Sequence, residues 1–277
     1  MPDSARRWRN TPLAWGLILI VAVAIVGVFG SWISPHDPLH VDLARRLEPP
    51  SKNFPLGTDP LGRCVLSRTL AGARISLGLA VAVSGAVTLI ALIVGAAGVF
   101  GGPIANRAVT RLIDVFISFP PLVLALATVG VAGPSSAAVA AAIAWAWWPA
   151  EARVARSLLH TARHRDYVDA AWLAGVHPAR VVVRHILPQI GPALAVRMSL
   201  EVGSVILALS TLSFLGLGTQ PPHPEWGVML SEARPFATTA PYLLLGPGLA
   251  LIVSVLGCNL VAEGLREQLD LRRISDW

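Results

Sequence analysis

Charged residues are scarce in this sequence, and lysine is almost absent. Only 14% of the 277 residues are charged, and the one lysine, Lys52, stands between Ser51 and Asn53. A phosphate-binding Walker A loop needs the pattern G-x-x-x-x-G-K-[ST], which cannot be written around Lys52. The H-E-x-x-H and G-x-S-x-G patterns of zinc proteases and serine hydrolases are also missing. The sequence therefore does not indicate an enzyme.

Metal ligands are equally sparse. The two cysteines, Cys64 and Cys258, form neither a metal-binding nor a redox spacing. His160 and His164 are four residues apart and could share a helix face as metal ligands, but the adjacent Arg163 opposes binding of another cation. A solvated basic face is the preferred interpretation. No metal, cofactor or catalytic residue is predicted for this chain.

Apolar residues dominate instead. They make up 54% of the sequence, and the mean hydropathy of +0.63 exceeds that of ordinary water-soluble domains. The apolar residues come in long uncharged runs, which suit a lipid environment. The high pI, about 10.5, comes from arginines between these runs rather than from a basic face with aromatic partners, so nucleic acid is not a predicted partner.

The uncharged runs predict an all-α, polytopic membrane protein with six transmembrane helices, because about 20 residues of helix cross a bilayer. Gly133-Pro134 divides the long run 115–150 into a tight helical hairpin. A cleaved signal peptide is an alternative for the first run, but that run is longer than usual and lacks a clear cleavage site. The six predicted spans are 13–33, 75–105, the two halves of 115–150, 190–218 and 236–262.

Arginine placement predicts the orientation in the membrane. With the N-terminus inside, the segments between spans hold about twice as many basic residues on the cytoplasmic side as on the opposite side, as the positive-inside rule requires. Both termini are therefore predicted to be cytoplasmic in a bacterial inner membrane. We divide the chain into residues 1–70, with the first span and an outer loop, and residues 71–277, a core with five spans and a cytoplasmic loop at 151–188.

The cytoplasmic loop is too long and too regular for a simple connector. Residues 166–175 contain helix-forming residues ending in Gly175, and Pro178 can start a second helical stretch that runs to Pro188. Ala170 and Ala171 would form a small, smooth surface, and Gly175 would permit a left-handed turn. This helix–turn–helix suits docking into a groove of a soluble partner.

The same residues resemble a known family motif. Asp169-Ala170-Ala171, then Gly175, then Ile186-Leu187-Pro188 resembles the EAA loop of binding-protein-dependent ABC importer permeases. In that family a short coupling helix inserts into the ATPase subunit. The resemblance therefore implies contacts with an ATPase partner. Its predicted contact residues are Tyr167, Asp169, Ala170, Ala171, Gly175, Leu187 and Pro188, with Asp169 replacing the usual glutamate.

Two further stretches resemble the peptide and nickel branch of this family, specifically a subunit that pairs with a different permease. The first is Leu56-Gly-Thr-Asp59 with the arginine motifs that follow it, and the second runs from Leu212 to Gly227. Cys64 and Leu209 depart from the branch pattern, which has acidic residues there. The resemblance implies a type I importer fold, a homologous permease partner in a heterodimer, ATP-binding subunits that use ATP and Mg, and an extracytoplasmic solute-binding protein.

Charge within a predicted span is a further clue. An unpaired ion in hydrocarbon costs about 2.5 kcal/mol or more, and Arg197 and Glu201 lie four residues apart on one helix face. We expect them to form an intramembrane ion pair, with a position along the solute pathway as the alternative.

The resemblance implies a channel-forming permease subunit of an ATP-driven importer of di- or oligopeptides. Nickel or another small solute is the alternative within the same class. A secondary transporter driven by an ion gradient would need intramembrane acids around broken midplane helices and inverted repeats, and no inverted repeat is seen.

Overall fold

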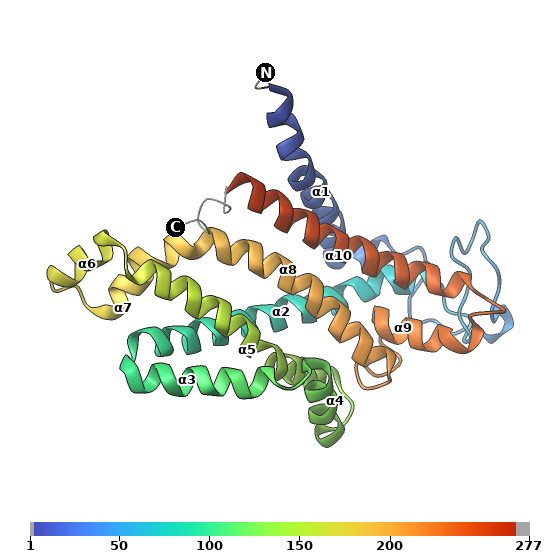
Figure 1. Cartoon of the computed structure of the whole chain (residues 1–277). Helices are drawn as coiled ribbons and strands as arrows, with labels where there is room; N and C mark the ends of the chain where they lie inside the picture. The colour runs from blue at the N-terminus through green and yellow to red at the C-terminus, as the bar shows by residue number, and fades with distance from the viewer. Residues whose placement is uncertain (1–2, 270–277) are drawn as a thin grey trace.

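The computed structural model describes residues 3–269, with the side chains of residues 3–11, 178 and 179 excepted, and over that range it consists of helices joined by loops (Figure 1). This confirms the all-α prediction; the end of the predicted core, residues 270–277, lies outside the described range. The elements are α1 (Asp3–Ile33), η1 (Leu43–Arg45), α2 (Val65–Phe100), α3 (Gly102–Ile117), α4 (Pro121–Ala132), α5 (Ser136–Arg163), α6 (Asp166–Leu173), α7 (Pro178–Val181), the π-helix η2 (Val182–Ile186), α8 (Leu187–Phe214), α9 (Trp226–Ala233), η3 (Arg234–Phe236) and α10 (Tyr242–Gln268).

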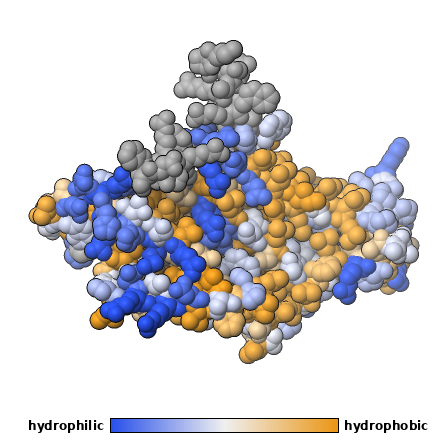
Figure 2. Space-filling view, in the orientation of Figure 1, coloured by the Kyte–Doolittle hydropathy of each residue, from blue (hydrophilic) through white to orange (hydrophobic). Residues whose placement is uncertain are grey.

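Four described helical segments are long and apolar enough to cross a membrane: α1 from Pro12 onward, α2, the segment Val182–Phe214 that contains α8, and α10. The pair α3 and α4 makes a fifth if it is one broken span. The remaining predicted span is α5, which has 28 residues and is therefore about 42 Å long; Glu151, Arg153 and Arg156 lower the hydropathy of its second half. Figure 2 shows hydrophobic residues over the middle of the bundle and hydrophilic residues gathered toward the end with α6 and α7.

The predicted helix boundaries need two corrections. First, α2 begins ten residues before the predicted start at 75, so Arg68 and Arg74 are helical and the expected boundary at residue 70 falls inside this helix. Second, the third span is not continuous, because α3 and α4 are bent by 83° at residues 118–120. Consecutive prolines, Pro120 and Pro121, explain the break, since they lack the amide hydrogens that would continue α3.

Close helix contact holds α1 against α10. A Cβ atom at Gly16 would lie 2.6 Å from the backbone nitrogen of Val261, and one at Gly264 would collide with the backbone of Leu13. Only glycine permits this approach. In lipid the hydrophobic effect does not drive helices together, so close van der Waals contact of this kind stabilises the pair. The first helix is thereby packed onto the rest of the bundle.

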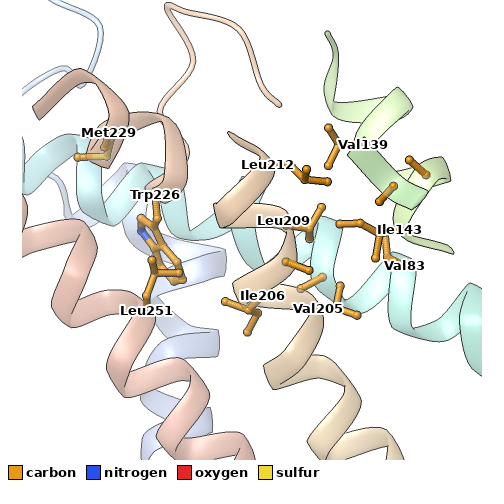
Figure 3. Close-up of a cluster of buried hydrophobic side chains, with 14 of the residues drawn as sticks. Val83, Val139, Ile143, Val205, Ile206, Leu209, Leu212, Trp226, Met229 and Leu251 are labelled. Atoms are coloured by element: carbon orange, nitrogen blue, oxygen red, sulfur yellow. The ribbon is translucent and has the colours of Figure 1, made fainter. Parts of the chain in front are cut away.

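The main core lies where α2, α5 and α8 meet, with α9 and α10 closing one side (Figure 3). Figure 3 shows Val205, Leu209 and Leu212 of α8 directed toward Val139 and Ile143 of α5. All five are buried. Helix α8 is therefore the central element of the fold.

At the end opposite α6, residues 34–64 fold into a compact loop region that is fastened to the helices. The Tyr242 hydroxyl donates to the Leu47 carbonyl at 2.8 Å, and the backbone nitrogen of Glu48 donates to Thr58 Oγ1 at 2.8 Å. Lys52 is exposed in this region, whereas Cys64 is buried. We call this part of the molecule the 34–64 end.

Four charged side chains form a cluster at the 34–64 end, in which Asp59, Arg63 and Arg68 are buried and Glu232 is partly exposed. Arg63 Nε donates to Asp59 at 2.6 Å, and Glu232 of α9 accepts from Arg63 at 3.1 Å and from Arg68 at 3.0 Å. Two positive and two negative charges balance, which satisfies the condition for burying ions. The cluster ties the loop, α2 and α9 together.

Short helix α9 docks onto α2 through Glu225 and Trp226. The Glu225 carboxylate is 1% exposed and accepts from the backbone nitrogens of Gly227 and Val228, each at 3.0 Å, and from Ser76 Oγ at 3.2 Å. The indole nitrogen of Trp226 donates to the Thr69 carbonyl at 3.0 Å. The stretch from Leu212 to Gly227, which resembles the peptide and nickel branch, therefore contains the N-cap of α9.

We predict that Glu225→Ala destabilises the fold by about 1–3 kcal/mol, because it removes the cap and leaves buried donors unpaired. A lower unfolding temperature in detergent would report the loss. Asp42→Ala is the matched control, since Asp42 caps η1 through one bond in an exposed position. Equal unfolding temperatures for the two variants would contradict the assigned role of Glu225.

Candidate functional site: the loop between α5 and α8

Residues 164–186, here called the α5–α8 loop, project from one end of the bundle (Figure 1). Helix α6 follows the end of α5 after two residues, and α7 and η2 lead without a gap into α8. The predicted helix, turn and second helix are thus present. The five-residue π-helix was not predicted; there the backbone nitrogen of Leu187 donates to the carbonyl of Val182.

The turn after α6 depends on Gly175, whose φ is +73°. The Gly175 nitrogen donates to the Trp172 carbonyl and the Val176 nitrogen to the Ala171 carbonyl, at 3.0 and 3.1 Å. This is the Schellman pattern, which ends a helix with a left-handed residue and satisfies its free carbonyls. The prediction of a left-handed turn at Gly175 is confirmed.

The inner side of α6 packs on a separate hydrophobic cluster. Val168 is fully buried, and Ala171 and Trp172 are partly buried against the same cluster. The expected pairing of Ala170 and Ala171 as one outer surface is therefore corrected, because Ala171 lies one residue further around the helix and faces inward. The cluster consists of Val99, Leu159, Ala162, Val168, Val181, Ile186 and Ile190.

The outer side of α6 carries Tyr167, Asp169, Ala170 and Leu173, all exposed. Leu173 is 90% exposed and is the residue of this site that sequence reasoning missed; an apolar side chain at the end of a short helix gives no periodic signal. Desolvation raises the pKa of Tyr167, so its hydroxyl stays protonated at neutral pH. The surface offers a small methyl, a branched apolar side chain, a hydroxyl donor and a carboxylate.

The other predicted contact residues lie at the start of α8. Pro188 occupies its first turn, as predicted, and is exposed, whereas Leu187 is partly buried against the loop's hydrophobic cluster. On α5, Arg163 donates to the carbonyl of Val99 and lies 5.6 Å from the Phe100 ring. These contacts anchor the base of the loop to the end of α2.

The predicted ion pair between Arg197 and Glu201 is wrong. Arg197 instead bonds to Glu151 of α5, with Nε 2.8 Å from Oε2 and Nη2 2.5 Å from Oε1. The Glu151 side chain is 8% exposed and that of Arg197 is 41% exposed. Glu201 is buried, and its Oε1 accepts no hydrogen bond from the described residues. The i, i+4 spacing aligned Arg197 and Glu201 correctly, but a bidentate partner on another helix gives a better geometry.

Other groupings of polar side chains do not form metal sites. Within residues 3–269, no group of three or more His, Cys, Asp or Glu residues is arranged to hold a metal ion. His160 and His164 lie with their ring centroids 4.9 Å apart in an edge-on contact.

Long apolar helices with a projecting helical loop define the class of the protein as a type I ABC importer permease. The methionine ABC transporter MetNI in an inward-facing conformation has this fold, with a TM-score of 0.55 over 75% of this chain and 94% of that one, at 16% identity. Residues 68–275 match the family described as the inner membrane component of binding-protein-dependent transport systems, and the chain belongs to that family. It is therefore a multi-pass inner-membrane protein.

Residues 3–50 match the N-terminal transmembrane domain of oligopeptide transport permease C. The chain is 39% identical to the nickel transport system permease protein NikC of Escherichia coli K12, over 94% of both chains. It is also 39% identical to the di/tripeptide permease DppC of Pseudomonas aeruginosa UCBPP-PA14, over 92% of this chain and 86% of that one. These relatives confirm the predicted peptide and nickel branch and disfavour an ion-gradient transporter.

We predict that Gly175→Val loosens α6. A Cβ atom at Gly175 meets no other atom within 4 Å, so the penalty of about 1–3 kcal/mol comes from the backbone conformation alone. Faster amide hydrogen exchange in residues 166–176 would report it. Gly175→Asn is the control, since asparagine tolerates a left-handed conformation, and similar exchange in both variants would count against this account.

Proposed function

We propose that this chain forms half of a solute passage and is driven by separate ATP-binding subunits that contact the outer side of α6. The observation that carries the proposal is Leu173, an apolar side chain left 90% exposed on a short helix whose inner side is packed. An exposed apolar side chain on a projecting helix beside the small Ala170 suits the central anchor of a protein contact. Because the sequence has no Walker A loop, ATP and Mg belong to the partner, and the energy reaches this chain as movement of the α5–α8 loop.

A second, homologous permease is proposed to complete the passage. Helix α8 exposes Ser204 and Thr211, which lie seven and fourteen residues after Arg197 and so share its face. Both hydroxyls bond to carbonyls of their own helix, at 3.1 and 2.7 Å. Arg197 on the same face is charged and its side chain is 41% exposed, and a charge within a span is unfavourable toward lipid. This exposure supports a heterodimer in which this face of α8 lines the passage.

The proposed solute is a di- or oligopeptide, delivered by an extracytoplasmic solute-binding protein. The relatives named for nickel and for di/tripeptides are equally identical to this chain, so nickel remains the second candidate. Purified complex with its binding protein distinguishes them through ATP hydrolysis stimulated by dialanine or by Ni²⁺.

Both termini are proposed to be cytoplasmic, which places the 34–64 end outside. The exposed Lys52 offers a direct test because it is the only lysine. We predict that a membrane-impermeant amine reagent labels the chain in intact spheroplasts, and that Lys52→Arg abolishes this labelling. Labelling at Lys52, separated from any N-terminal label by peptide mapping, that requires permeabilised membranes would reverse the orientation.

We predict that Leu173→Asp, alone or with Ala170→Arg, abolishes co-purification of the ATP-binding subunit while leaving the amount of membrane-inserted chain unchanged. Either change puts a charge where a close apolar contact is expected. Leu43→Asp is the matched control, since Leu43 is also exposed, at 65%, but lies at the 34–64 end. Normal co-purification of the double variant would remove the main support for the proposed contact.

A further inference from the structure

The two helices that flank the α5–α8 loop are joined by the ion pair between the buried Glu151 and the partly exposed Arg197. Glu151 precedes the end of α5 by about 18 Å, and Arg197 follows the start of α8 by about 15 Å, at 1.5 Å of rise per residue. The pair therefore joins the two arms at nearly the same distance from the loop. Arg197 uses two nitrogens and Glu151 both oxygens.

Between this pair and the tip of the loop, the arms are held by apolar contacts. Leu159 and Ala162 of α5 share a cluster with Ile186 and Ile190 around α8. Packed apolar surfaces resist separation but allow small sliding of one helix along another. A bidentate pair between a planar guanidinium and a carboxylate has a fixed direction and length, so it resists that sliding.

We propose that Glu151 and Arg197 are positioning residues that lock α5 to α8, so that movement delivered at α6 reaches the spans as motion of one rigid unit. This rests on the proposed function, because it assumes that a partner moves α6. In the locked unit, displacement of the loop moves α8 and its polar face. Without the ion pair, α5 and α8 slide past each other, and the movement delivered at α6 deforms the α5–α8 loop instead of displacing the spans.

The surroundings of the pair suit a mechanical role. Glu201, one turn further along α8, is buried beside the pair and interacts electrostatically with both Glu151 and Arg197. The small apolar residues Ala91 and Ala155 line the adjoining cavity together with Thr88. Among Glu151, Arg197 and Glu201, the bidentate contact is the one between Glu151 and Arg197.

Arg197→Met and Glu151→Gln test the lock in the assembled transporter, reconstituted with its binding protein and given labelled dialanine or radioactive nickel in separate assays. We expect assembly and ATP hydrolysis to persist, and solute taken up per ATP hydrolysed to fall by about fivefold or more. The exchanged pair, Glu151→Arg with Arg197→Glu, should recover part of the ratio. Arg153→Met is the control, because Arg153 pairs with Asp114 of α3 in an exposed position at 2.6 Å and should leave the ratio unchanged.

An unchanged ratio in both single variants would overturn the inference. If unpaired charge prevents the single variants from assembling, the apolar double variant Glu151→Leu with Arg197→Met decides, since it removes both partners of the pair together. A parent-like ratio there also overturns the inference. The Leu173→Asp variant separates the two claims. If it still binds and stimulates the ATPase, the proposed function fails, whereas failure of the lock alone leaves the Leu173 result intact.

Discussion

Hydrocarbon cannot hydrogen-bond to a peptide group, and this constraint shapes the whole chain. Each backbone amide within the lipid must be satisfied by its own helix, so the irregular segments are pushed to the ends of the bundle. Residues 34–64 and the turn before α9 lie at one end, and the α5–α8 loop lies at the other. The break between α3 and α4 is the exception, and the two prolines that cause it also remove two of the donors that would otherwise need partners.

The irregular segments at the two ends of the bundle are stabilised by different kinds of contact. At the 34–64 end, buried ions and the Glu225 cap fix loops directly to α2 and α9. At the other end, apolar packing under α6 holds the loop, and Arg163 fastens its base to the Val99 carbonyl. Ionic contacts fix direction, whereas apolar contacts permit small displacements. The difference fits an end that is held still and an end that receives movement.

Local patterns in the sequence predicted most of the helices, because hydropathy, glycine and proline act over a few residues. The break at Gly133-Pro134, the turn at Gly175 and the placement of Pro188 all follow from such rules. The early start of α2 was missed because Arg68 and Arg74 end the uncharged run. Arg68 is nevertheless buried, because it pairs with Glu232, far along the chain. Likewise the partner of Arg197 is 46 residues away, and no periodicity within α8 could identify it.

Helix α8 connects these observations. It begins directly after the loop proposed to contact an ATPase, and its 28 residues extend about 42 Å to the segment that leads into α9. Near its far end, a Cβ atom at Gly227 of α9 would collide with the backbone of Ser210, so the two helices are in close contact there. One continuous helix therefore touches the loop proposed to receive the movement, carries the face proposed to line the passage, and meets the element fixed by Glu225 and Glu232. Because a helix transmits displacement along its axis with little loss, α8 has the position that a link between ATP hydrolysis and the opposite membrane surface requires.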